Sequence, residues 1–118
     1  MGFAEKYNKF NTIFDIDIKD FEFMDGYDFI EKYGDKVVKI DGLYINKKGM
    51  YADHPVAIIE SEKILLDLPS YMSDTVNEIL TDSEAIDLIK KGLVGLQARE
   101  YENNTYHKRC VGFEWCNL

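Results

Sequence analysis

Apolar and polar residues alternate along residues 10–24, where Phe14, Ile16 and Ile18 share one face. This period of two is typical of a half-buried strand, or of two short strands separated by a break near residue 20. We expect residues 1–14, of which only 10–14 belong to this pattern, to be flexible.

The following residues predict a short helix and then a hairpin. Asp25 precedes a helix expected over 26–33, and Gly34 can end it. Residues 36–46 predict a long strand, and the turn-forming residues after it favour a return through 56–60. The shared face of the long strand holds Val38, Ile40 and Tyr44. A further strand is predicted over 63–68.

The second half predicts two helices and a second hairpin. Ser70 can cap a helix over 70–80, and Thr81 with Glu84 forms a capping box for a helix over 82–91. The apolar stripes of these helices are Met72, Val76, Ile79 and Leu80, and Ala85, Ile86 and Ile89. Residues 93–102 and 108–115 then predict paired strands, in which Val111, Phe113 and Trp115 share a face.

These elements define a single domain over residues 1–118 with an α+β fold. We expect five to seven mostly antiparallel strands and two or three short helices. They would form either an open sheet or a small OB-like barrel. A hydrophobic fraction of 46% is ordinary for a globular domain of this size.

The net charge of −8 is unevenly distributed. Residues 15–35 carry −6 and residues 60–89 carry −7, whereas the two predicted hairpins, 36–59 and 90–118, carry +2 each. The overall acidity excludes a uniformly basic nucleic-acid binder, but it leaves two locally basic surfaces.

Sequence features for export, membrane insertion and disulfide bonding are absent. The first residues lack the regions of a signal peptide, and no apolar run is long enough to cross a bilayer. Cys110 and Cys116 would lie about 20 Å apart on one strand, beyond disulfide reach. We therefore expect free thiols and a cytoplasmic location.

No catalytic motif is present, so we expect a protein that is not an enzyme and needs no cofactor. His54 and His107 both lie in predicted turns, and neither has a serine in a nucleophile elbow nearby. The spacing of His107, Cys110 and Cys116 lacks the paired ligands of a zinc site, so no metal is predicted.

The most informative cluster combines aromatic and basic residues at the two hairpins. Aromatic rings can stack on bases while cations follow the phosphates of a single strand. The alternative is that the rings pack within the sheet and the loop lysines are only solvated. The candidate nucleic-acid-binding residues are Tyr44, Lys47, Lys48, Tyr51, Arg99, Tyr101, Tyr106, Lys108 and Arg109.

The chain resembles small accessory proteins of Gram-positive phages and integrative elements. The segments that carry the resemblance are GLYINKKGMYADHPV (42–56), LLDLPSYMSDTVNEIL (65–80), KKGLVGLQAREYE (90–102) and VGFEW (111–115). Some of these proteins are described as binding single-stranded DNA. The resemblance covers about residues 36–115 and implies no catalytic residue.

The sequence therefore favours a phage or mobile-element accessory protein that binds single-stranded nucleic acid through its basic and aromatic hairpins. The alternative is an acidic interaction module that engages a basic host or phage protein, as a mimic of nucleic acid. An unpaired edge strand would also allow a homodimer.

Overall fold

The computed structural model describes residue 14 and residues 16–46, 54–103 and 108–118, without the side chains of residues 102, 103, 108 and 109. The elements in chain order are β1 (Glu22–Met24), α2 (Gly26–Tyr33), β2 (Val37–Lys39), β3 (Gly42–Asn46), β4 (His54–Ile59), the 3-10 turn η1 (Glu60–Glu62), β5 (Ile64–Asp67), the 3-10 turn η2 (Ser70–Met72), α3 (Ser73–Leu80), α4 (Ser83–Lys90), β6 (Val94–Asn103) and β7 (Lys108–Asn117).

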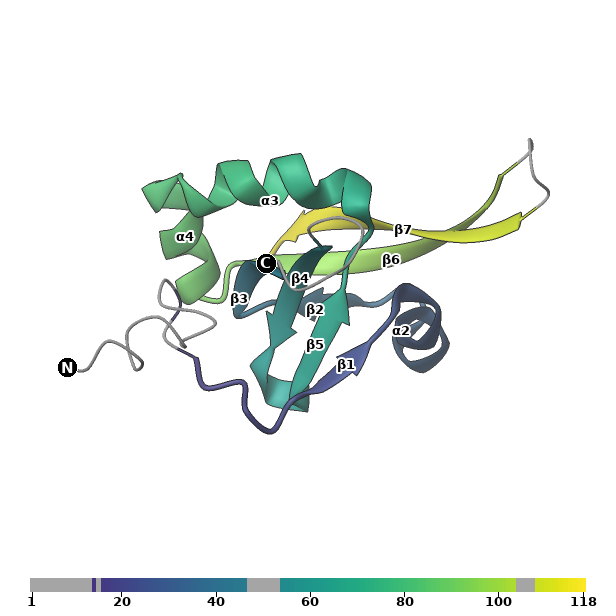
Figure 1. Ribbon diagram of the computed structural model, residues 1–118, viewed down its shortest axis with the longest axis horizontal. Coiled ribbons are helices and arrows are strands. Elements are labelled where there is room, and N and C mark those ends of the chain that lie inside the picture. The colour runs from purple at the N-terminus through teal and green to yellow at the C-terminus, as the bar shows by residue number, and fades with distance from the viewer. Residues whose placement is uncertain (1–13, 15, 47–53, 104–107) are drawn as a thin grey trace.

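The strands form two sheets, one of order β1-β5-β4-β3 and one of order β2-β6-β7 (Figure 1). All pairs are antiparallel except β1 with β5. The α+β prediction is confirmed. The described strands form no closed barrel, because the outer strands of the two sheets do not pair with each other.

The two sheets are joined where β2 passes into β3. The backbone N–H of Ile40 donates to Val94 O (3.1 Å), and the next N–H, of Asp41, donates to Ile58 O (2.7 Å). The continuous strand expected over 36–46 is therefore wrong, because its two halves pair with different sheets. As a result, Val38 and Ile40 pack in the main core, whereas Tyr44 packs in a separate cluster.

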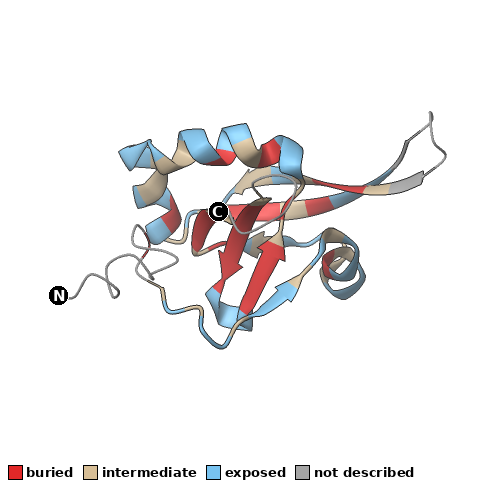
Figure 2. Ribbon diagram, viewed as in Figure 1, coloured by how far each residue is buried: buried red, intermediate tan, exposed pale blue. Residues whose placement is uncertain are grey.

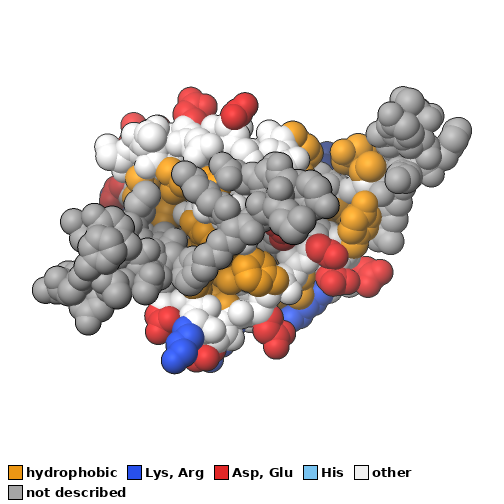
Figure 3. Space-filling model, in the orientation of Figure 1, with side chains coloured by type: hydrophobic (Ala, Val, Ile, Leu, Met, Phe, Trp, Pro, Cys, Tyr) orange, Lys and Arg blue, Asp and Glu red, His pale blue; other side chains and the backbone are white. Residues whose placement is uncertain are grey.

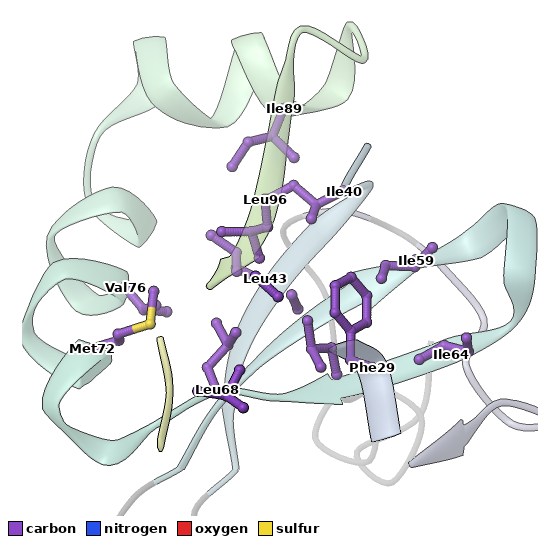
Figure 4. Packing of buried hydrophobic residues seen from close by; sticks show 14 of the residues in the cluster. Phe29, Ile40, Leu43, Ile59, Ile64, Leu68, Met72, Val76, Ile89 and Leu96 are labelled. Atoms are coloured by element: carbon purple, nitrogen blue, oxygen red, sulfur yellow. The ribbon is translucent and has the colours of Figure 1, made fainter. Parts of the chain in front are cut away.

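The main core fills the space between the two sheets and the helices (Figure 4). Phe29 of α2, Val76 of α3 and Ile89 of α4 are all buried there. Phe29 meets the ring of Phe113 with 5.8 Å between centroids. Buried positions follow β4 and β5, whereas the outward faces of α3 and α4 are exposed (Figure 2).

The predicted stripes of the helices are buried or half-buried, but two of the expected caps are wrong. No side chain caps α3, and Ser70 begins η2 instead. Asp82 rather than Thr81 caps α4, by accepting from the N–H groups of Glu84 and Ala85. A carboxylate there also interacts well with the positive end of the helix dipole.

The expected strand over 10–24 is largely wrong for the residues that are described. Ile16 and Ile18 are half-buried and Asp17 is exposed, so the alternation in burial holds although these three residues are not in a strand. Ile16 and Ile18 pack on the second face of the larger sheet, which is consequently covered on both faces. Only residues 22–24 of this segment form a strand, β1.

Both predicted hairpins are confirmed as antiparallel pairs, β3 with β4 and β6 with β7. Phe113 and Trp115 pack against the main core, of which Val111 is part, as their shared face predicts. Cys110 and Cys116 form no disulfide bond. Within the described ranges, no helix has the length and apolar character to cross a membrane.

We expect Gly95→Ala to destabilise the pairing of β2 with β6. A Cβ at Gly95 would lie 2.8 Å from Val37 Cγ1 and 3.0 Å from the backbone oxygen of Val38. The strands must therefore shift, at a cost of about 1–3 kcal/mol, which urea denaturation would measure. Gly26→Ala is the control, because its nearest contacts at 3.4 Å are ordinary. Equal stability of the two variants would contradict this packing.

Candidate functional site

Three of the nine candidate nucleic-acid-binding residues have described side chains: Tyr44, Arg99 and Tyr101. Lys108 and Arg109 belong to β7, but their side chains are outside the description. The remaining four, Lys47, Lys48, Tyr51 and Tyr106, lie outside the described residues.

Tyr44 is not on the surface, which corrects the expectation that its ring could stack on a base. Its side chain is 7% exposed and packs with Val56, Ile58 and Leu65. The register of β3 on β4 sets Tyr44 opposite Val56, on the sheet face that Ile16 and Ile18 help to cover. Tyr44 therefore packs within the sheet, as the alternative interpretation of the aromatic residues predicts.

Arg99 and Tyr101 lie on the face of the smaller sheet that points away from the main core, and both are exposed. They alternate along β6 with Ala98, which is buried, so their side chains point away from the core. Tyr101 pairs with Cys110 across the hairpin, and Arg99 pairs with Gly112. Of the predicted residues, these two are brought together by the structure.

A second tyrosine from a distant element joins Tyr101 above Gly112. A Cβ at Gly112 would lie 3.3 Å from Tyr101 Cε1 and 3.3 Å from the hydroxyl oxygen of Tyr71 in η2. Both rings therefore approach the same glycine, which is buried beneath them. These distances are tighter than ordinary contacts, so an alanine here would require the two tyrosine side chains to shift by a few tenths of an ångström.

Tyr27 of α2 is the third member of the group. The neighbouring Gly26 packs against Val111 and Phe113, so the start of α2 lies against the core-facing side of the hairpin stem, opposite the face that carries Tyr101 and Gly112. Tyr27 is also close enough to Tyr101 to influence its ionisation. We call Tyr27, Tyr71 and Tyr101 the tyrosine cluster. Their exposed fractions are 45%, 65% and 49%.

The tyrosine cluster offers neutral rings with hydroxyl groups. Loss of hydration raises the pKa of Tyr101, and the ionisable groups of Cys110, Tyr71 and Tyr27 raise it further. The phenol therefore stays protonated at neutral pH. Hydrophobic side chains, with tyrosine counted among them, gather at the base of the protruding hairpin (Figure 3).

Arg99 supplies a cation beside the cluster. Its Nη2 lies 3.1 Å from Glu114 Oε2, and both side chains are more than half exposed. Exposed ion pairs of this kind contribute little to stability. Arg99 can therefore exchange Glu114 for a phosphate at small cost.

The ends of the two hairpins are linked through η2. Leu68 N–H donates to Pro55 O (2.9 Å), which fastens the end of β5 to the start of β4. The chain then enters η2, where Tyr71 reaches the stem of the β6–β7 hairpin at Gly112. Through Tyr71, η2 therefore connects the β4–β5 part of the larger sheet to the stem of the protruding β6–β7 hairpin.

No protein-family model, curated protein or solved structure matches this chain. Functional inference therefore rests on the geometry of the site. Within the described residues, no group of three histidine, cysteine or acidic side chains is placed to hold a metal ion. His54 Nδ1 lies 3.7 Å from Asp67 Oδ1, which is too long for a hydrogen bond.

The pattern of aromatic and basic residues does not include Tyr27 and Tyr71. Both fall in predicted helices, distant in sequence from the basic residues of the hairpins. Two features could have indicated Tyr71. Pro69 interrupts the helical pattern just before it, and Gly112 in a predicted strand signals a close approach by another group.

The buried hydroxyl group of Tyr44 should make the fold less stable at alkaline pH. Burial, with a contribution from Asp67, raises the pKa of Tyr44 to about 12 from 10.0. Above pH 10 the unfolded chain loses this proton before the folded chain does. The free energy of unfolding should then fall by roughly 2 kcal/mol by pH 12.

We expect Tyr44→Phe to lack this part of the alkaline loss, as measured by urea denaturation between pH 9 and about pH 12. Tyr71→Phe is the control, because Tyr71 is largely exposed and its replacement should leave the alkaline loss intact. An identical pH dependence for wild type and Tyr44→Phe would show that Tyr44 ionises freely.

Proposed function

We propose that the protein binds single-stranded nucleic acid, with the tyrosine cluster as a stacking platform and the two hairpin loops as phosphate contacts. The observation that carries the proposal is the approach of two exposed tyrosines from separate elements, Tyr71 and Tyr101, to Gly112 on the outer face of the hairpin stem, with exposed Tyr27 near Tyr101. Stacking needs exposed rings, and it tolerates any base because every base has a flat aromatic face.

The distribution of charge supports this assignment. The described side chains include 18 acidic and eight basic residues. The remaining bases are Lys6, Lys9, Lys47, Lys48, Lys108 and Arg109. In sequence, Lys47 and Lys48 follow β3 directly and Lys108 and Arg109 begin β7, so four of the six adjoin the hairpins while the described body is acidic.

Binding of this kind would be weakened by salt. Each lysine or arginine that neutralises a phosphate releases condensed counterions, and salt opposes that release. Salt also screens the long-range repulsion between the acidic body and the strand, which offsets part of this loss of affinity. Such binding needs no catalytic step, in keeping with the accessory role that the resemblance implies.

We expect Tyr71→Ala and Tyr101→Ala each to weaken binding of a fluorescent oligo-dT strand by about fivefold to 150-fold, which corresponds to the loss of one stacked base. Fluorescence anisotropy at low salt measures the affinity. Tyr71→Phe and Tyr101→Phe should retain most of it, because the ring remains.

Phe23→Ala is the matched control for surface aromatic loss. Phe23 is 61% exposed on β1 and is not a member of the cluster. This variant should bind as wild type does. If oligo-dT does not bind at micromolar protein and low salt, or if Phe23→Ala weakens binding as much as Tyr71→Ala does, the proposal is wrong.

The loop lysines can be tested separately through salt dependence. We expect the double variant Lys47→Ala/Lys48→Ala to reduce the slope of log affinity against log salt by about 0.7 for each lysine that contacts a phosphate. Lys19→Ala/Lys36→Ala removes two exposed lysines of the body and should leave the slope unchanged. Equal effects of the two double variants would indicate attraction by net charge alone.

A further inference from the structure

One acidic side chain lies on the sheet face that carries Tyr101. Side chains alternate between the two faces of a strand, so Arg99 and Tyr101 of β6 share this face with Gly112 and Glu114 of β7. Among the described side chains of β6 and β7, Glu114 is the only carboxylate at an outward-facing position. Two residues, about 7 Å along the strand, separate it from Gly112.

The path along β7 from the tyrosines to Glu114 is open. Tyr71 and Tyr101 both approach Gly112, which has no side chain of its own. The residue between Gly112 and Glu114 is Phe113, which packs against the main core on the other face. A base stacked on the rings can therefore turn its edge toward the Glu114 carboxylate.

The Glu114 carboxylate has one described partner, which it can release. Gln97 lies directly opposite Glu114, but its Nε2 donates to Asp35 O at 2.6 Å. Among the described cations, only Arg99 is within ion-pair distance of this carboxylate, at 3.1 Å. Both side chains are more than half exposed, so their pairing contributes little to stability. When Arg99 turns to a phosphate, Glu114 can accept hydrogen bonds from a ligand.

A carboxylate at this position would discriminate among bases. It repels phosphates, so it lowers the affinity for a strand unless a base offers hydrogen-bond donors. An ionised carboxylate accepts through two oxygens that lie side by side. Of the four DNA bases, only guanine places two donors, N1–H and N2–H, next to each other on its pairing edge. Thymine has a single N3–H between two carbonyl oxygens, which a carboxylate repels.

We propose that Glu114 selects guanine at the base that stacks on the tyrosine cluster. Its two carboxylate oxygens accept from N1–H and N2–H, while Arg99 binds a neighbouring phosphate. This inference rests on the proposed binding of single strands and narrows the ligand to strands that contain guanine. Glu114 is then a specificity-determining residue of the site.

The test compares three short fluorescent strands by anisotropy at low salt. They are oligo-dT, the same strand with one central guanine, and the same strand with inosine, which lacks the N2 amino group. We expect wild type to bind the guanine strand about fivefold or more tightly than oligo-dT, which is the lower range for a bidentate base contact. The inosine strand should fall between them, because one of the two hydrogen bonds is lost.

Glu114→Gln separates base selection from simple repulsion of phosphate. This variant loses a negative charge, so it should bind oligo-dT at least as well as wild type does, while its preference for the guanine strand should fall toward none. Glu62→Gln is the matched control for net charge. Glu62 is exposed in η1, at the opposite end of β5 from η2, and its replacement should leave the guanine preference unchanged.

Equal wild-type affinity for guanine and inosine strands, or an undiminished guanine preference in Glu114→Gln, would overturn selection by Glu114. Competition by free guanosine monophosphate at the strand's own concentration would also overturn it, because the ligand would then be a nucleotide and not a strand. In the first two cases, binding of oligo-dT that Tyr71→Ala weakens would still support the tyrosine cluster as a strand site. Failure of all three strands to bind would overturn both proposals.

Discussion

The attachment of consecutive peptide groups to different sheets at Ile40 and Asp41 determines how the rest of the molecule is arranged. The N–H of Ile40 bonds to Val94 O and the N–H of Asp41 bonds to Ile58 O. The Asp41 carboxylate holds the bend by accepting from Glu60 N–H at 2.8 Å and pairing with Lys39 at 3.3 Å. Ile40 is fully buried beside it. This junction sets the β6–β7 hairpin against the larger sheet.

That placement gives the hairpin two different ends. Toward its loop, the stem meets η2 and α2, and Tyr71 and Tyr101 both approach Gly112, with Tyr27 close to Tyr101. Toward the end of β7, an apolar hollow lies between the smaller sheet and helices α3 and α4.

Local patterns in the sequence predicted the hairpins and the apolar stripes of the helices, because those depend on neighbouring residues. These patterns wrongly assigned Tyr44 to the same face as Val38 and Ile40, because the alternation over 36–46 gives no sign that the strand changes sheets after Ile40. The capping pattern likewise favoured Thr81, although Asp82 accepts the hydrogen bonds. The tyrosine cluster could not be predicted as a group, because Tyr27, Tyr71 and Tyr101 meet only through tertiary packing.

The most direct test of the proposed nucleic-acid site is residue-resolved NMR of the isotope-labelled protein during titration with oligo-dT. Ring and backbone signals of Tyr27, Tyr71, Tyr101 and Gly112 should shift together and saturate at one affinity, while the indole signal of Trp115 stays in place. Shifts confined to α3, α4 and Trp115, or an absence of shifts at the tyrosine cluster, would contradict the account.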